Sequence, residues 1–216
     1  MIEIKIPGNI LGIFWTIDSW VESEESISVK NMDKKKIDKV QRFITDYYQK
    51  YKIYSTTEQK RGDKYNFYNL KIYNTEFIKL LREYYLWTGR KEYTCYYPDN
   101  MNESQDRNFL KYYVNDKSSL DKKGGRLRIF ANWNFINVIN EKLHNMLGVK
   151  IKKAISHSNS DKMKVLNYQG RKEIAVILDF VEYNFKNNGY RRCTNCSKIY
   201  PVFEIADGLC SACHNR

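Results

Sequence analysis

The fold is decided by residues 109–143, whose sequence is FLKYYVNDKSSLDKKGGRLRIFANWNFINVINEKL. This stretch begins with most of an apolar and aromatic run, 108–116, that predicts a helix. Two glycines mark a turn at 122–125. Residues 126–131 then alternate in polarity like a strand, and 134–147 place apolar side chains at helical steps. The stretch therefore predicts two helices separated by a turn and a strand.

The first half of the chain repeats this order. An apolar run at 10–18 precedes an alternating strand at 26–30, and apolar residues return at helical steps from 33 to 48. The matching strand residues, 100 positions apart, are Ile27 with Leu127 and Val29 with Ile129. A further strand and helix follow in each half, at 66–73 and 75–87 and at 162–168 and 173–185. We therefore predict an internal duplication.

The composition favours a globular, basic protein. Hydrophobic residues make up 42% and aromatic residues 15% of the 216 residues, which is enough for a core and argues against global disorder. The formal net charge of +12 suits a polyanion, and nucleic acid is the commonest such partner. A membrane surface is the competing partner, but no apolar run approaches the roughly 18 residues of a spanning helix. We expect no membrane contact, no secretory signal and an intracellular location, in the cytoplasm or the nucleoid or nucleus.

Four cysteines near the C-terminus form two CxxC pairs, Cys193 with Cys196 and Cys210 with Cys213. Two such pairs supply the four thiolates of a tetrahedral Zn²⁺ site. Disulfides and unliganded thiols are the alternatives. A segment this short buries little apolar surface, so a structural Zn²⁺ would stabilise it directly.

The duplicated pattern resembles the LAGLIDADG homing endonuclease family in its single-chain, two-repeat form. Residues 11–22, LGIFWTIDSWVE, resemble the first signature helix and first strand, and 109–143 resemble the second signature helix, its hairpin and the helix after it. Residues 89–100, GRKEYTCYYPDN, are similar to the segment between the repeats. The resemblance covers about residues 8–187.

The resemblance implies an α+β fold with two pseudo-symmetric repeats, at 1–98 and 99–187, each with an antiparallel sheet and helices. A small zinc-binding module is expected at 188–216. It further implies a monomer with an internal pseudo-twofold, whose sheets form a basic saddle on double-stranded DNA. In the family, each signature helix ends in an acidic residue, and the pair holds Mg²⁺ at the scissile phosphates.

The first signature leaves two registers open. Counted back from the strand, Asp18 stands at the acidic position and Ser19 replaces the usual glycine. Counted forward from Gly12, Ile17 takes the acidic position instead. One residue is inserted between the two reference points, and Asp18 is the candidate catalytic residue; a solvated polar residue at the helix end is the alternative.

The second signature departs further. Lys117 stands at the acidic position and Tyr112 at the packing glycine. Asp116, one residue away, is a second catalytic candidate only if the end of the helix is rewound. A lysine repels Mg²⁺, although its ammonium can neutralise a phosphate.

Candidate DNA contacts lie on the strands and at the hairpin tips. Alternation places Arg126 and Arg128 on one face, opposite Leu127 and Ile129, and arginine suits guanine in the major groove. The other candidates are basic residues at strand or tip positions: Lys60, Arg61, Lys71, Lys122, Lys123 and Lys164. The alternative is that these charges keep exposed surfaces soluble.

These features favour a LAGLIDADG-like double-stranded DNA-binding protein with weakened or lost nuclease activity. An active Mg²⁺-dependent site-specific endonuclease is the first alternative, so the sequence leaves open whether the chain is an enzyme. An RNA-binding or splicing helper, or a transcription-associated zinc protein that binds a protein partner through the zinc module, is a further alternative.

Overall fold

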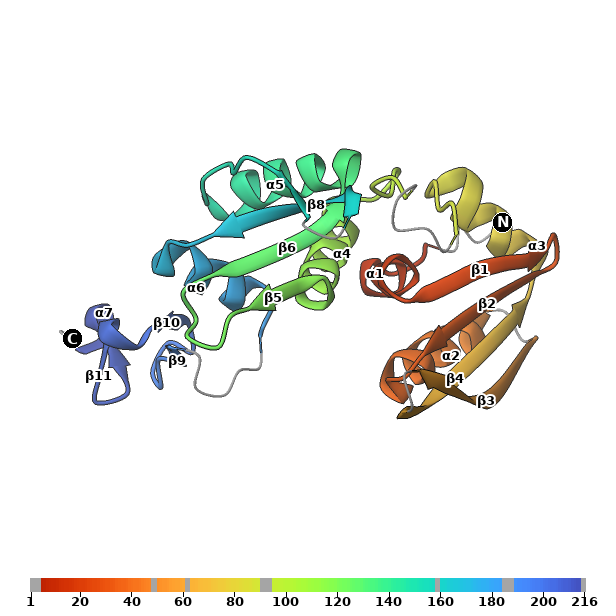
Figure 1. Ribbon diagram of the computed structural model, residues 1–216, viewed down its shortest axis with the longest axis horizontal. Coiled ribbons are helices and arrows are strands. Elements are labelled where there is room, and N and C mark those ends of the chain that lie inside the picture. The colour runs from red at the N-terminus through yellow and green to blue at the C-terminus, as the bar shows by residue number, and fades with distance from the viewer. Residues whose placement is uncertain are drawn as a thin grey trace. The chain divides into compact units, whose positions relative to one another are not determined.

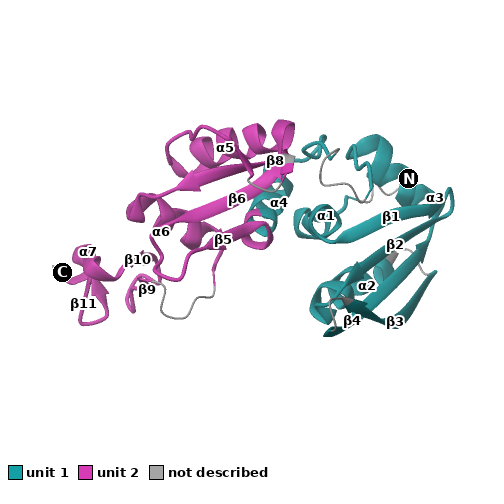
Figure 2. Cartoon of the chain, viewed as in Figure 1, with its two compact units in different colours: residues 1–113 teal, residues 114–216 magenta. Residues whose placement is uncertain are grey.

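The computed structural model describes residues 5–47, 50–60, 63–89, 95–157, 160–183 and 189–214 (Figure 1). The chain divides into two compact units, residues 1–113 and 114–216 (Figure 2). Within the described residues, no helix is both long enough and apolar enough to cross a membrane.

Unit 1 contains a four-stranded antiparallel sheet with the strand order β1-β2-β4-β3. Its elements are α1 (Gly8–Thr16), β1 (Asp18–Ser23), β2 (Ser26–Asn31), α2 (Lys34–Tyr47), β3 (Tyr51–Lys60), β4 (Asp63–Tyr73), α3 (Thr75–Lys79) and a π-helical turn (Leu80–Tyr84). The helix α4 (Glu103–Asp116) begins in unit 1 and ends in unit 2.

The core of unit 1 lies on one face of this sheet. Ile27 and Val29 of β2 pair with Ile72 and Leu70 of β4, and all four side chains are fully buried. The alternation predicted for 26–30 and 66–73 is thus confirmed. β3 was not predicted as a strand. The predicted tip between β3 and β4 falls on residues 61–62, which lie outside the described part of the chain.

Unit 2 repeats the same architecture. Its sheet has the strand order β5-β6-β8-β7, and every pairing is antiparallel. The elements are β5 (Ser118–Leu120), β6 (Leu127–Asn132), α5 (Trp133–Leu147), β7 (Ile155–His157), β8 (Ser160–Tyr168) and α6 (Arg171–Phe180). α5 ends at Gly148 in the left-handed conformation (φ 68°), which glycine adopts without strain. The chain is therefore α+β with two like repeats, as predicted.

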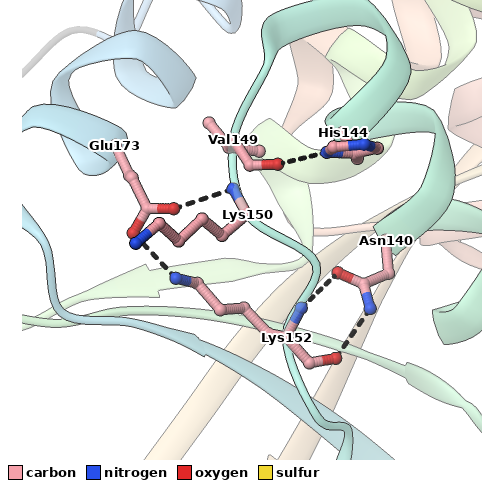
Figure 3. A network of polar contacts seen from close by, with 6 residues as sticks. All are labelled: Asn140, His144, Val149, Lys150, Lys152 and Glu173. Carbon is pink, nitrogen blue, oxygen red and sulfur yellow. Dashed lines mark hydrogen bonds and ion pairs between the residues drawn. The ribbon is translucent and has the colours of Figure 1, made fainter.

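Polar contacts hold the segment between α5 and β7 (Figure 3). The Asn140 side chain donates from Nδ2 to the Lys152 carbonyl oxygen at 2.7 Å and accepts from the Lys152 amide at 3.0 Å. His144 Nδ1 lies 2.9 Å from the Val149 carbonyl oxygen, so this histidine serves packing. These bonds replace the missing backbone pairs of an irregular segment.

Glu173, in the first turn of α6, binds the same segment. Its carboxylate accepts from the Lys150 amide at 2.8 Å and pairs with Lys152 Nζ at 2.7 Å (Figure 3). Burial raises the pKa of Glu173, but the hydrogen bonds from Lys152 and the Lys150 amide outweigh burial and hold that pKa below its usual range. The carboxylate is therefore charged at neutral pH and ties α6 to the segment.

The C-terminal part of unit 2 is a small module. Its elements are β9 (Tyr190–Arg192), β10 (Ile199–Pro201), a 3-10 turn (Val202–Glu204), β11 (Ile205–Ala206), β12 (Leu209–Cys210) and α7 (Ser211–His214). It packs against α6, where Asp179 Oδ1 accepts from the Ile199 amide at 3.2 Å and lies 3.4 Å from Arg192 Nη1. Asp207 and Gly208 both have positive φ and form the two-residue turn between β11 and β12.

Candidate nucleic-acid interface and metal centre

The two signature helices meet within unit 1, where α1 packs on the first part of α4. Of the two glycines in α1, Gly8 is the one that faces the α4 backbone. A Cβ placed there would lie 1.9 Å from the Gln105 carbonyl oxygen and 2.9 Å from the Phe109 amide nitrogen. Gln105 also donates from Nε2 to the Ile6 carbonyl oxygen at 2.8 Å, which fixes the chain just before α1. The two helices therefore cross at close range, and Gly8 permits the crossing.

Tyr112 occupies the position at which the resemblance expects a packing glycine. A Cβ on Gly12 would lie 2.8 Å from Tyr112 Cδ1 and 2.9 Å from Tyr112 Cβ. The glycine of α1 thus makes room for the aromatic ring of α4. The small residue opposite therefore accommodates a tyrosine at this crossing.

The strand pairing gives the register of the first signature. Asp18 is exposed, begins β1 and pairs with Lys30, and Ser19 pairs with Val29. Ser19 is fully buried, and its hydroxyl donates to the Phe14 carbonyl oxygen at 2.9 Å, which closes the end of α1. Counted from the strand, Asp18 is therefore the residue at the acidic position, and Ile17 separates it from the end of α1.

The second repeat has the equivalent pairs. Ser118 pairs with Ile129, and the Lys117 carbonyl oxygen accepts from the Phe130 amide at 2.9 Å. Lys117 therefore has the strand position of Asp18. Asp116 is the last residue of α4 and lies outside the strand.

The inserted residue is Ile17. α1 ends two residues before Asp18, whereas α4 ends one residue before Lys117. Ile17 is 6% exposed and packs in the core, so the extra residue is absorbed between helix and strand.

The face of the first sheet opposite its core is polar and internally paired. Lys71 of β4 lies on this face, because its neighbours in the strand, Leu70 and Ile72, are buried in the core. Its ammonium forms an ion pair with Glu22, which also accepts from the Ser28 hydroxyl. The hydrogen bond from Lys71 is the largest cause that lowers the pKa of Glu22. A DNA phosphate could therefore pair with Lys71 only by displacing the Glu22 carboxylate.

The corresponding face of the second sheet has unsatisfied polar atoms. Arg128 of β6 pairs with Asn167 of β8, so their side chains lie side by side, while Leu127 and Ile129 face the core. Arg128 Nε and Asn167 Oδ1 are buried, and neither has a hydrogen-bond partner in the part of the chain that the structure describes. Such atoms cost free energy unless a water or a ligand satisfies them. Arg126 precedes the strand and is exposed.

Lys164 lies on the other face. It pairs with Ala131 and shares its strand parity with Leu166 and Tyr168, which are buried beneath the helices. At the end of the sheet, its Nζ donates to Ser156 Oγ at 2.8 Å. The alternation that predicted a DNA contact for Lys164 together with Arg128 therefore places the two residues on opposite faces.

The tip between β5 and β6 presents two lysines. Lys122 and Lys123 are exposed. Asp121 closes the tip, since its carbonyl oxygen accepts from the Gly124 amide at 3.0 Å and its Oδ1 accepts from the Gly125 amide at 2.7 Å. In the other hairpin, Lys60 ends β3, and Arg61 lies outside the described residues.

The four cysteines come together in the module. Their Sγ atoms all lie within 4.8 Å of one another, and those of Cys196 and Cys210 are 3.9 Å apart. Tetrahedral Zn²⁺ with Zn–S bonds of about 2.3 Å requires sulfurs about 3.8 Å apart. The cluster can therefore hold a metal ion with this preference, as the CxxC spacing predicted. His214 is exposed and is not one of this group.

The cluster shifts the pKa values of Cys193 and Cys213 in opposite directions. Backbone amides of Cys196 and Cys210 direct their hydrogens at the Cys193 sulfur and lower its pKa to about 6. The neighbouring Cys210 sulfur raises the pKa of Cys213 to about 12. Sulfurs this close repel one another when charged, and a cation at their centre removes that repulsion.

Comparison with solved structures relates the whole arrangement to known folds. The homing endonuclease I-WcaI bound to its DNA recognition sequence matches with a TM-score of 0.54 and 13% identity over 81% of this chain and 80% of that chain. I-DmoI in complex with DNA and Mn matches with a TM-score of 0.51 and 16% identity over 82% and 97%. The N-terminal LAGLIDADG domain of DUF199/WhiA matches with a TM-score of 0.51 and 10% identity over 86% of both chains. The chain has a LAGLIDADG-type fold.

The sequence itself has diverged far within this fold. No protein-family model matches it, and no curated protein matches it. It spans 57% of the length of the full-length DUF199/WhiA from Thermatoga maritima, over 83% of its own length. The LAGLIDADG-type fold is therefore shown by the arrangement of helices and strands. This arrangement is retained although few of the side chains are identical.

Asn167 of β8 is not among the residues that the sequence predicts to contact DNA. Its register beside Arg128 nevertheless puts it on the outward face of the second sheet. The signal was its alternation with Leu166 and Tyr168, both of which are buried.

Proposed function

We propose that this chain is a LAGLIDADG-derived double-stranded DNA-binding protein whose nuclease activity is weakened or lost. The observation that carries the proposal is the strand register, which aligns Lys117 of the second repeat with Asp18 of the first. Two carboxylates bind Mg²⁺, whereas an ammonium in place of one repels it and attracts phosphate.

Charge and the sheet faces support duplex DNA as the ligand. The net charge of +12 suits a polyanion, and arginine beside asparagine is a pair that can read base edges. Two of the similar structures, I-WcaI and I-DmoI, are described in complex with DNA.

For the C-terminal module we propose a structural Zn²⁺ held by Cys193, Cys196, Cys210 and Cys213. Four sulfur donors at this spacing favour zinc over the oxygen-preferring Mg²⁺ and Ca²⁺. The ion would supply folding free energy to elements of only two to four residues. Thiolates of this kind also suit a reducing, intracellular compartment.

The alternative is an active Mg²⁺-dependent endonuclease. Asp18 and Asp116 would then have to supply the two carboxylates. Asp18 is exposed and suited to a metal, but Asp116 belongs to the last turn of α4 and would need that turn to rewind.

A selection from random duplexes tests both functions. Duplexes retained by the protein are incubated with Mg²⁺, and the strands are resolved on a denaturing gel. We expect retention with a steep salt dependence and no cleavage. The matched variant Asp18→Asn should retain duplexes equally, because no carboxylate is needed for binding.

Magnesium-dependent cutting of both strands that disappears in Asp18→Asn would establish the endonuclease instead. Structured RNA serves as competitor in the same assay. If it displaces the duplex at equal phosphate concentration, the RNA-binding alternative replaces the proposal. If neither nucleic acid is retained, a protein partner for the zinc module becomes the leading explanation.

A further inference from the structure

The four-cysteine module touches the tip that carries Lys122 and Lys123. Tyr190, the first residue of β9, donates its hydroxyl to the Gly124 carbonyl oxygen at 2.7 Å. The tyrosine is 2% exposed, so this bond is shielded from water. Figure 1 shows the turn between β5 and β6 beside β9.

A second contact lies next to the first. Gly189 has φ 78°, and a Cβ placed on it would lie 3.3 Å from the Lys123 carbonyl oxygen. The Gly189 carbonyl oxygen accepts from the Val202 amide at 2.9 Å. The backbone before β9 therefore runs along the tip and is itself held by the module.

β9 is joined directly to the cysteine cluster. Its three residues pair with β10, and Cys193 follows at once, with its amide donating to the Lys198 carbonyl oxygen at 2.9 Å. Whatever orders the cluster therefore orders Tyr190. On the other side, Asp179 of α6 fixes β10 through the Ile199 amide.

We infer that the module braces the tip between β5 and β6, so that metal binding at the four cysteines presents Lys122 and Lys123 to DNA phosphates. This inference rests on the DNA-binding function proposed above. A tip with two adjacent glycines has many conformations, and ordering it upon binding costs free energy. The hydrogen bond from Tyr190 and the contact at Gly189 hold the tip in one conformation before DNA binds.

The variant Tyr190→Phe tests the brace. It keeps the buried ring and removes only the hydroxyl. Binding to a random-sequence duplex is followed by fluorescence anisotropy across a salt series, and zinc content by a colorimetric chelator. We expect wild-type zinc content, weaker DNA binding, and a salt slope lower by about 0.9 for each phosphate that the tip no longer neutralises.

Tyr97→Phe is the matched control. It removes a tyrosine hydroxyl that donates to Asp106 Oδ1 at 2.6 Å in unit 1, whereas the tip belongs to unit 2. It should keep the wild-type slope, so a general loss of stability cannot imitate the effect. The double variant Lys122→Gln, Lys123→Gln should lower the slope by itself, and adding Tyr190→Phe to it should lower the slope no further.

Hydrogen exchange in the wild-type protein provides a test without a variant. The amides of Gly124 and Gly125 bond to Asp121, and their protection should fall when zinc is removed. Unchanged protection, or a Tyr190→Phe slope equal to wild type, would overturn the brace while DNA binding stands. Absence of duplex binding by the wild type would instead defeat the proposed function.

Discussion

Replacing Gly8 with alanine tests the helix crossing on which the LAGLIDADG-type fold depends. The new Cβ would lie 1.9 Å from the Gln105 carbonyl oxygen, where real contacts are essentially never below 3.0 Å. Because the obstacle is the backbone of α4, no side chain can rotate away, and the helices must separate by roughly an ångström. Overpacking of this kind costs about 3 kcal/mol. The better helix propensity of alanine returns at most about 1 kcal/mol.

We therefore expect Gly8→Ala to lower the free energy of unfolding by about 2 kcal/mol, measured by urea denaturation with zinc present. Gly125→Ala is the control, since its Cβ would meet only Asp121 Oδ2, at an ordinary 3.7 Å. Gly12→Ala meets the Tyr112 side chain instead of backbone, so Tyr112→Ala should partly rescue it but should not rescue Gly8→Ala. A Gly8→Ala protein as stable as wild type would refute the close crossing.

Three further predictions concern stability. Tyr168→Phe should raise the free energy of unfolding by about 1 kcal/mol in urea denaturation, because its buried hydroxyl has no hydrogen-bond partner among the described residues. Removing the proposed Zn²⁺ with a chelator, or replacing Cys210 with serine, should expose the amides of β9 to β12 to hydrogen exchange, while the amides of β6 and β8 stay protected. If β6 and β8 lost protection at the same time, the metal would not stabilise the C-terminal module alone. The pKa of Glu173 is lower in the folded protein than in the unfolded chain, so the Glu173 carboxylate stabilises the fold above the ordinary carboxyl pKa. This stabilisation is lost as the pH falls through the pKa of the folded state. In acid denaturation, the free energy of unfolding should therefore decline more steeply for the wild type than for Glu173→Gln.

Apolar alternation predicts the inner strands β2, β4, β6 and β8, whereas the edge strands lack it, and β1 followed only from the resemblance. β6 alternates between buried and half-buried residues over Leu127–Phe130, and the pattern was visible. β3 lies at the edge of its sheet, and its described side chains are exposed or half-buried throughout. An edge strand whose two faces are both exposed to solvent does not show the alternation of apolar and polar residues that predicts a strand. β5 and β7, with three residues each, are too short to show one.

The candidate sites divide in the same way. The cysteine cluster could be predicted, because CxxC spacing fixes the geometry locally. The brace could not, since Tyr190 and Gly124 are 66 residues apart and neither carries a motif. The register of Asp18 stayed open because the core absorbs Ile17, and only strand pairing shows where the extra residue went.

Lys117 has the strand position of Asp18, and this exchange shows how the fold can be kept while the charge at that position changes. The resemblance implies that the helix crossing gives the fold its shape and that the acidic residues serve cleavage, so the two roles fall on different residues. Gly8 keeps the crossing, and Gly12 accommodates Tyr112, so the fold survives a side chain that its pattern excludes. Exchanging one carboxylate of a pair for an ammonium changes the charge by two units toward positive, which weakens Mg²⁺ binding and strengthens phosphate binding. Under the proposed function, Lys117→Asp should therefore raise the affinity for Mg²⁺, measured by calorimetry, and lower the affinity for duplex DNA. If both affinities stay unchanged, Lys117 does not stand at an acidic position of the proposed kind.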